Sequence, residues 1–334
     1  MKKINGRNVQ IAGTVEHRCG GFAYRLDPDH QTFPAALEFA LVAGGCCDRD
    51  DNLYVFTRDM DRPIVKLNPE GEVLSIFGAG LFKSTHFLYV TPENTLLCVD
   101  FAQSVVRELT ADGKHIRDFG TLGVPSDSGY DTKIWRKRRR VCDHVPPEYG
   151  IEPAWEFQEA LRTKKRAAPP FNNPCAVAMN SKGEYYFADG YGNVAVHKFS
   201  ADGKHVKTWG GPGEEPGAFF LPHAIWIDPL DRVWVCDREA DIVQVFDGEG
   251  TPLAFINEGF TQPSGIWGDD AHLYVVGRGG ILTIFNLEID IVARLGYFNS
   301  DLRAHDICGD SKGNLYLFPT GTNMDHQVIK LERL

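Results

Sequence analysis

Three histidines of this 334-residue chain stand at the same place in a repeated sequence pattern, each at the head of a short apolar run. They are His86 in THFLYV, His223 in PHAIWI and His305 in AHDICG. Three neutral imidazoles with an open fourth position form the ligand set of a catalytic zinc site, and imidazole also suits iron, copper or nickel. If the fold brings the three repeats together, the sequence predicts a catalytic metal, with zinc as the first choice, at these residues.

The pattern around the histidines recurs along the chain, which indicates how they could meet. The corresponding positions are Gly45, His86, Cys175, His223, Ser264 and His305. The step is 41 residues from Gly45 to His86, from His223 to Ser264 and from Ser264 to His305. A repeat of ~40–45 residues with several short strands is typical of a β-propeller. We therefore expect an all-β, six-bladed propeller with the histidines in blades 2, 4 and 6, about 120° apart around the central channel.

The remaining segments fit one propeller domain that covers residues 1–334. In the N-terminal segment, residues 1–38, the run FAYRL predicts a strand that completes the last blade and so closes the ring. Residues 121–168 form an insertion between blades 2 and 3. Its EPAWEFQEALRTKKR run has apolar residues at helical spacing, which predicts an amphipathic helix. Because this connection emerges where the first strands enter the channel, we expect the insertion to cover the channel mouth as a lid, with its KIWRKRRR run as a solvated loop.

Composition limits the class of protein and its surroundings. The net charge of −10 argues against a general nucleic-acid binder. No run of apolar residues approaches the length of a membrane span, and the N-terminus has no apolar core of a signal peptide. Eight cysteines without a CxxC pair are typical of a reduced, cytoplasmic protein without structural disulfides. Cys175 also leaves open a free cysteine nucleophile, and the oligomeric state cannot be predicted.

A second set of polar residues follows the repeat heads by thirteen to sixteen residues, near the end of each second strand. Its members are Arg58, Asp100, Asp189, Tyr191, Asp237 and Arg238. Since a strand pair turns back on itself over that distance, these residues should face the same mouth. Arg58 and Arg238 could bind a substrate carboxylate, or could form salt bridges between blades. Tyr191 could act as a general base if nearby cations stabilise its phenolate, whereas the aspartates are most simply structural turn residues.

The repeats resemble those of NHL-repeat propellers, and more narrowly those of the peptidyl-α-hydroxyglycine α-amidating lyase family. The resemblance rests on LPHAIWIDPLDRVWVCDREADIVQVF, on FNNPCAVAMNSKGEYYFADGYGNVAVHKF and on AHDICGDSKGNLYLF. It implies that His86, His223 and His305 hold zinc, and that Tyr191, Arg58 and Arg238 serve catalysis. It further implies a structural calcium at Asp306 with backbone carbonyls near Gly45 and Leu88. Arg303 replaces an apolar methionine of the family, so it could add a cation for substrate binding.

The resemblance also implies a reaction, in which a zinc-dependent lyase splits the C–N bond of a carbinolamide into an amide and a glyoxylate-type aldehyde. The family's cysteine after the DGY motif is Gly192 here, and no secretory signal is seen. We therefore expect a small-molecule substrate with a carboxylate, without nucleic acid or membrane as partner. Two alternatives stay open: a metal-dependent hydrolase, such as a lactonase or amidase, and a non-catalytic NHL binding module.

Overall fold

The computed structural model describes residues 15–26, 41–131, 133–134, 153–319 and 328–334, and additionally the backbone of residues 2–4 and 7–9. Of the residues from 153 to 156, only the backbone is described. The expected roles of Trp155 and of most of the KIWRKRRR run therefore lie outside the described side chains. None of the helices in the described parts is long and apolar enough to cross a lipid bilayer.

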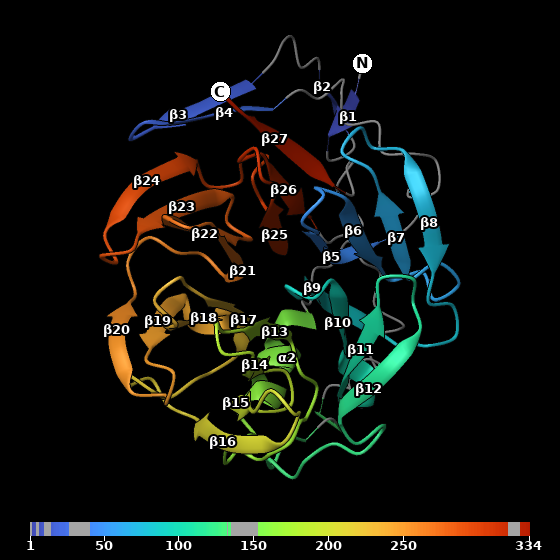
Figure 1. Ribbon diagram of the computed structural model, residues 1–334. Helices are drawn as coiled ribbons and strands as arrows, with labels where there is room; N and C mark the ends of the chain where they lie inside the picture. Colours follow the sequence, from blue (N-terminus) through green and yellow to red (C-terminus); the bar gives the residue numbers. More distant parts are fainter. Residues whose placement is uncertain are drawn as a thin grey trace.

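Six antiparallel sheets surround a central axis, which confirms the all-β, six-bladed propeller (Figure 1). Blade 1 consists of β5 (Val42–Cys47), β6 (Leu53–Thr57), β7 (Ile64–Leu67) and β8 (Val73–Phe77). Blade 2 consists of β9 (Thr85–Val90), β10 (Thr95–Asp100), β11 (Val105–Thr110) and β12 (His115–Gly120). Blade 3 consists of β13 (Ala176–Met179), β14 (Tyr185–Asp189), β15 (Ala195–Phe199) and β16 (His205–Gly210).

The second half of the ring repeats this order. Blade 4 consists of β17 (Pro222–Ile227), β18 (Val233–Asp237), β19 (Ile242–Phe246) and β20 (Pro252–Ile256). Blade 5 consists of β21 (Pro263–Gly268), β22 (His272–Gly277), β23 (Ile281–Asn286) and β24 (Ile291–Gly296). Blade 6 consists of β25 (Asp306–Gly309), β26 (Leu315–Phe318), β27 (Ile329–Arg333), β4 (Phe22–Leu26) and β3 (Val15–Cys19). A separate two-stranded sheet pairs β1 (Lys2–Ile4) with β2 (Arg7–Val9).

Blade 6 is completed by the N-terminal part of the chain. Strand β4, the predicted FAYRL strand, pairs antiparallel with β27, with Leu26 opposite Leu331. Strand β3 then adds a fifth strand outside β4, which the sequence did not predict. This pairing closes the ring and covers the edge that β27 would otherwise expose.

Burial differs between the inner and the outer strands of the blades. The inner three strands are almost wholly buried, because the sheets pack face to face on both sides, and the outermost strands β8, β12, β16 and β20 are largely exposed. Apolar clusters fill the spaces between neighbouring blades, as where Val65 of blade 1 meets Phe318 of blade 6. Each blade thus buries both faces only when the ring is complete.

The first strand of each blade lines the channel, and in blades 1, 2, 4 and 5 a β-bulge lies near its start. Val42 and Gly44 pair with consecutive residues of β6, so Ala43 is the extra residue, and His223 and Ser264 are extra in the same way. In blade 2 the register shifts at the same place, beside His86. A bulge turns one side chain out of the regular alternation and leaves its backbone groups outside the ladder. The equivalent position in blade 1 is therefore Ala43, which corrects the prediction of Gly45 by two residues.

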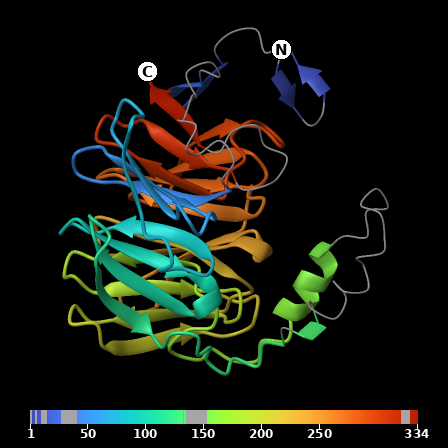
Figure 2. The ribbon, with the colours of Figure 1, turned by 90° about the vertical axis from the view of Figure 1, so that its right-hand side faces the viewer.

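The insertion between β12 and β13 contains α2 (Pro153–Leu161), which lies on one face of the ring (Figure 2). The helix is shorter than the helical pattern predicted, because the chain turns after Leu161: the amide nitrogens of Thr163 and Lys164 donate to the carbonyls of Ala160 and Leu161 at 3.1 and 3.3 Å. Ala160 and Leu161 are buried. The C-terminal end of α2 is thereby attached to the propeller body.

Candidate metal centre

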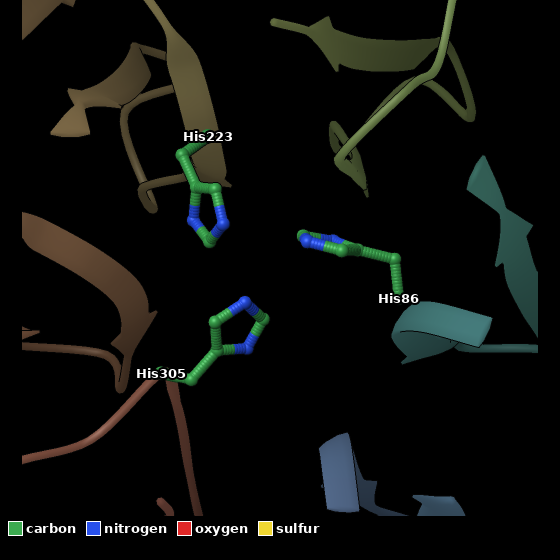
Figure 3. Close-up of side chains that lie close together, drawn as sticks. All are labelled: His86, His223 and His305. Atoms are coloured by element: carbon green, nitrogen blue, oxygen red, sulfur yellow. The ribbon is translucent and has the colours of Figure 1, made fainter. Parts of the chain in front are cut away.

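His86, His223 and His305 approach one another at the channel axis, each from its own blade (Figure 3). Their potential ligand atoms all lie within 4.8 Å of one another. The ring centroids are separated by 4.9 Å between His86 and His223 and by 4.8 Å in the other two pairs. The convergence predicted from the repeat is thus present, and the triad could hold a metal ion.

Backbone carbonyls of the neighbouring blades fix the orientation of all three rings. The Nδ1 atom of His86 lies 2.8 Å from the Cys175 carbonyl, that of His223 lies 2.7 Å from Ser264, and that of His305 lies 2.7 Å from Ala43. A carbonyl oxygen only accepts hydrogen bonds, so each Nδ1 carries the proton and each Nε2 carries a lone pair. The acceptors stand at the repeat-head position of blades 3, 5 and 1, so every histidine is oriented by the blade that follows it.

The environment keeps the imidazoles neutral. Burial lowers the pKa of all three well below the usual value of histidine. The positive charges of Arg58 and Arg238 lower the pKa of His86 further, and Arg238 does the same for His223. Neutral imidazoles are the form that binds a metal.

An unpaired buried nitrogen atom indicates that the three histidines fit a metal ion. The Nε2 atom of His305 is buried and has no hydrogen-bond partner. A buried polar atom without a partner costs free energy, and three lone pairs directed at one point repel one another. A cation at that point would satisfy all three nitrogens at once, with the Nδ1–H···O=C bonds as the usual outer support of metal-binding histidines.

Tyr191 lies directly above the triad. Its hydroxyl is 3.1 Å from Nε2 of His86 and 3.3 Å from Nε2 of His223, and it accepts a hydrogen bond from Nη1 of Arg238 at 3.0 Å. The same guanidinium donates through Nε to Glu239 at 2.8 Å, with both side chains almost fully buried. Arg238 therefore places a positive charge beside the tyrosine oxygen.

The residue that follows each second strand forms a mouth layer above the histidines. The amide nitrogens of Arg58, Arg238 and Arg278 donate to the residue just before the first strand of the same blade, at 2.7, 3.0 and 3.1 Å. Phe101 makes the same bond in blade 2. Arg278 was not predicted from the sequence, although it follows the second strand β22 as Arg58 follows β6. Arg58 and Arg278 are exposed, and neither side chain has a hydrogen-bond or ion-pair partner among the described residues.

Blades 2 and 3 give the mouth an aromatic side. The rings of Phe101 and Tyr191 are 5.0 Å apart, and Phe157 of α2 lies 6.0 Å from Tyr191. The Arg238 guanidinium is 6.0 Å from the Phe157 ring. The insertion therefore contacts two predicted site residues, and the sequence did not predict the role of Phe157 at the mouth.

Lys164 secures the insertion next to Tyr191. Its buried ammonium donates to the carbonyls of Gly190 and Phe220 at 2.8 and 2.6 Å. Burial lowers the pKa of Lys164 to about 7, although the charge of Asp237 opposes this shift. Because Gly190 precedes Tyr191, this bond also supports the backbone that carries the tyrosine.

The aspartates of the second strands are structural, as the sequence favoured. Asp100 accepts from the amide nitrogens of Lys83 and Ser84, and Asp237 accepts from those of Phe220 and Leu221. Asp189 accepts from Asn172 in the same manner. Each carboxylate thus holds the loop that leads into its own first strand.

Cys175 does not provide a nucleophile. Burial, with the negative charge of Asp189, raises the pKa of its thiol to about 12. The thiolate is the reactive form of cysteine, so this side chain is inert at neutral pH. The contribution of Cys175 to the site is its backbone carbonyl.

The residues expected to bind calcium are only partly brought together. Asp306 is buried and accepts hydrogen bonds from the amide nitrogens of Gly45 at 3.2 Å and of Ile307 at 2.8 Å. Burial raises the pKa of this carboxyl well above its usual value, so it is either neutral or compensated by a cation. Gly45 presents its N–H rather than its carbonyl, and Leu88 is buried in the neighbouring first strand β9. The calcium site stays a prediction.

Arg303 lies in the connection between β24 and β25, on the side of Arg278. Its aliphatic part packs close to Gly280, where an added Cβ would lie 3.1 Å from its Cγ. The Nε atom of Arg303 is buried without a hydrogen-bond partner. The expected contact of Arg303 with substrate stays a prediction.

The fold and the triad define a class, a propeller with a buried three-histidine centre, and sequence comparison adds the proteins that the chain resembles. No family model matches the chain. Human NHL repeat-containing protein 3 is 36% identical over 95 residues, 28% of this chain and 27% of that protein. Peptidyl-α-hydroxyglycine α-amidating lyase 2 of Drosophila melanogaster is 30% identical over 173 residues, 47% of this chain and 41% of that protein. A probable lyase of the same name from Caenorhabditis elegans is 26% identical over 220 residues, 63% of this chain and 50% of that protein.

The chain is therefore an NHL-repeat six-bladed propeller related to these lyases and to NHL repeat-containing protein 3 at modest identity. The matches span half or less of the length of each relative. Solved structures agree on the fold. A streptogramin B lyase superposes with a TM-score of 0.59 at 13% identity, over 90% of this chain and 96% of that one. A gluconolactonase from Xanthomonas campestris gives 0.58 at 13% identity, over 97% and 98%.

Proposed function

We propose that the protein is a zinc-dependent lyase that splits a carbinolamide carrying a carboxylate into an amide and a glyoxylate-type aldehyde. The observation that carries this proposal is the hydroxyl of Tyr191, held by Arg238 within 3.1 Å of a triad whose three Nε2 lone pairs converge. Similarity to proteins named as α-amidating lyases supports the reaction type. Zinc is the metal that best suits three neutral imidazoles, and it would supply Lewis acidity to a substrate oxygen.

The contacts of the side chains at the mouth suggest a separate role for each of them in the proposed reaction. Arg58, which is exposed and unpaired among the described residues, and the remaining face of Arg238 bind the substrate carboxylate. Tyr191 acts as the general base that takes the proton of the substrate hydroxyl. The oxygen then forms a C=O bond while the C–N bond breaks, and Tyr191 returns the proton to the amide nitrogen that leaves. Phe101 and Phe157 exclude water from the aromatic side of the mouth.

The described part of the insertion suits a cover for this site. Phe157 contacts Tyr191 and Arg238, and Lys164 anchors the segment that follows α2. We propose that residues 121–168 act as the lid of the channel mouth. The small-molecule nature of the substrate and the cytoplasmic location stay predictions.

The test uses the zinc-loaded protein and N-benzoyl-α-hydroxyglycine in ¹⁸O-water. A lyase releases benzamide without ¹⁸O together with glyoxylate. An amidase instead releases benzoate that contains ¹⁸O, because water attacks the acyl carbon. Benzamide formation that is lost in Tyr191→Phe would support the proposal. Release of labelled benzoate, or no turnover of any carbinolamide by metal-loaded protein, would contradict it and would favour the hydrolase or the binding module.

A further inference from the structure

The mouth layer carries more positive charge than one carboxylate needs. Three guanidinium groups, those of Arg58, Arg238 and Arg278, follow the second strands of blades 1, 4 and 5. Glu239 neutralises Arg238, to which it is bonded at 2.8 Å. Two positive charges remain, and the α-carboxylate of the proposed substrate would compensate one of them.

Other carboxylates near the mouth already interact with groups other than Arg278. Asp237 accepts the amide nitrogens of Phe220 and Leu221 and faces the ammonium of Lys164, and Asp59 pairs with Arg62 at 2.8 Å. Asp241 accepts the amide nitrogen of Gln262 at 2.6 Å and is exposed. None of them forms an ion pair with Arg278 among the described residues.

Arg278 is held at the mouth by its backbone, while its side chain has no hydrogen-bond or ion-pair partner in the part of the chain that the structure describes. Its amide nitrogen donates to the Gln262 carbonyl at 3.1 Å, and the Gln262 side chain donates to Glu239 at 3.2 Å. Glu239 in turn accepts from Arg238, so Arg278 and Arg238 stand on either side of one polar network. Partial desolvation at the mouth and the positive charge of Arg238 lower the pKa of Arg278, although its side chain is exposed. Like charges in such proximity cost free energy until an anion lies between or above them.

The connection between β24 and β25 adds a further guanidinium group, that of Arg303, on the side of Arg278. Arg303 packs against Gly280, and its Nε atom is buried without a hydrogen-bond partner. Polar atoms of this kind are normally satisfied by protein, water or ligand. The side of the mouth formed by blade 5 and its connection to blade 6 therefore offers two guanidinium groups, and among the described residues neither the Arg278 side chain nor Nε of Arg303 has a partner. This side lies opposite the aromatic side formed by Phe101 and Phe157.

We propose that Arg278, with Arg303 behind it, forms a second anion subsite, and that the substrate is a dianionic carbinolamide with a further carboxylate on its acyl part. This inference rests on the proposed function for the identity of the first carboxylate. The α-carboxylate binds at Arg58 and Arg238 near the triad, and the second carboxylate binds over blade 5. The two subsites then fix the orientation of the C–N bond relative to Tyr191.

The experiment compares two substrates that differ only in the distal carboxylate, N-succinyl-α-hydroxyglycine and N-butanoyl-α-hydroxyglycine. The zinc-loaded wild type should favour the succinyl compound by about tenfold or more in kcat/KM, the size of one hydrogen bond to a charged group. Arg278→Gln should abolish this preference by slowing only the succinyl compound, and Arg303→Gln should reduce it. Arg294→Gln, on the exposed outer strand of the same blade, is the matched control and should keep it. Because the Arg278 side chain has no partner among the described residues and lies near another cation, the thermal midpoint of Arg278→Gln should be no lower than that of the wild type.

Equal turnover of both compounds by the wild type, or a preference that survives in Arg278→Gln, would overturn the second subsite and leave the proposed function intact. Failure to turn over either compound would instead contradict the proposed function. In that case, calorimetric titration of the protein with succinate and with butanoate measures binding at the second anion subsite directly. Tighter binding of succinate, lost in Arg278→Gln, supports the subsite, and equal binding of the two acids overturns it.

Discussion

The histidine layer and the mouth layer of this propeller follow opposite rules. In the histidine layer, blades 2, 4 and 6 contribute the same residue, held by the same kind of carbonyl at 2.7 to 2.8 Å. In the mouth layer, the corresponding position carries arginine in blades 1, 4 and 5, but Phe101 in blade 2 and Gly190 in blade 3. The repeated backbone therefore determines the geometry of the three histidines, whereas single side chains of the mouth layer determine what can bind above the triad.

The carbonyls that orient the histidines all lie outside the regular ladder at the start of a first strand. Bulges place Ala43 and Ser264 there, and Cys175 lies just before β13, so that their carbonyls fix the tautomers of the three histidines. The residues after the second strands are held only through their amide nitrogens, so their side chains can change without disturbing the ladder.

Tyr191→Phe is expected to give the largest effect in the mouth layer. The variant keeps the ring contact with Phe101 and loses only the hydroxyl, so kcat for a carbinolamide should fall by roughly 10²–10⁴-fold, as for removal of a general base. Metal content should not change. Tyr297→Phe, at an exposed tyrosine, is the control. A Tyr191→Phe enzyme with full kcat would remove the tyrosine from the chemistry.

Arg238 and Arg58 should differ although they occupy equivalent positions. Arg238 touches Tyr191 and Glu239, so Arg238→Gln should lower kcat by roughly 10–100-fold, the size of one hydrogen bond to a charged group. Arg58 has no protein partner in the described residues, so Arg58→Gln should mainly raise KM, by about tenfold. Steady-state kinetics separates the two effects. Equal changes of kcat and KM in both variants would mean that the two arginines of the mouth layer are equivalent, as the three histidines are.

Lys164→Met should produce the smallest effect, on the pH dependence of stability. The folded pKa of Lys164, about 7, lies below its unfolded value of 10.5, so between these values the unfolded chain binds more protons. Stability should therefore rise with pH in this range, by up to about 1.4 kcal/mol per pH unit. Denaturant unfolding at pH 7 to 10 should show this rise in the wild type and in the exposed control Lys165→Met. A Lys164→Met protein with the same slope would show that Lys164 does not lose its proton on folding.

The parts of the site that depend on the repeat could be predicted from the sequence. The spacing between His223, Ser264 and His305 gave the blade number and the convergence. Gly45 was assigned two residues away from the true equivalent, Ala43, because a bulge adds a residue without changing the apolar pattern. Arg278 had a recognisable signal, since it follows its strand as Arg58 and Arg238 follow theirs.

The parts that depend on tertiary packing could not be predicted in the same way. The helical pattern of the insertion does not contain the information that Phe157 meets Tyr191, or that Lys164 inserts between the carbonyls of Gly190 and Phe220. The fifth strand of blade 6, β3, depends on a hairpin whose partner lies at the other end of the chain. Such contacts are set by the surface on which a segment docks.

The most direct test of the central claim is the metal content of the purified protein after zinc reconstitution, measured by plasma mass spectrometry. The wild type and the exposed-histidine control His115→Ala should each hold about one transition metal ion per chain. His86→Ala, His223→Ala and His305→Ala should each lose it, and to the same extent, because the three positions are equivalent. A wild type that binds no transition metal, or a triad variant that binds it as tightly as the wild type, would contradict a three-histidine metal centre.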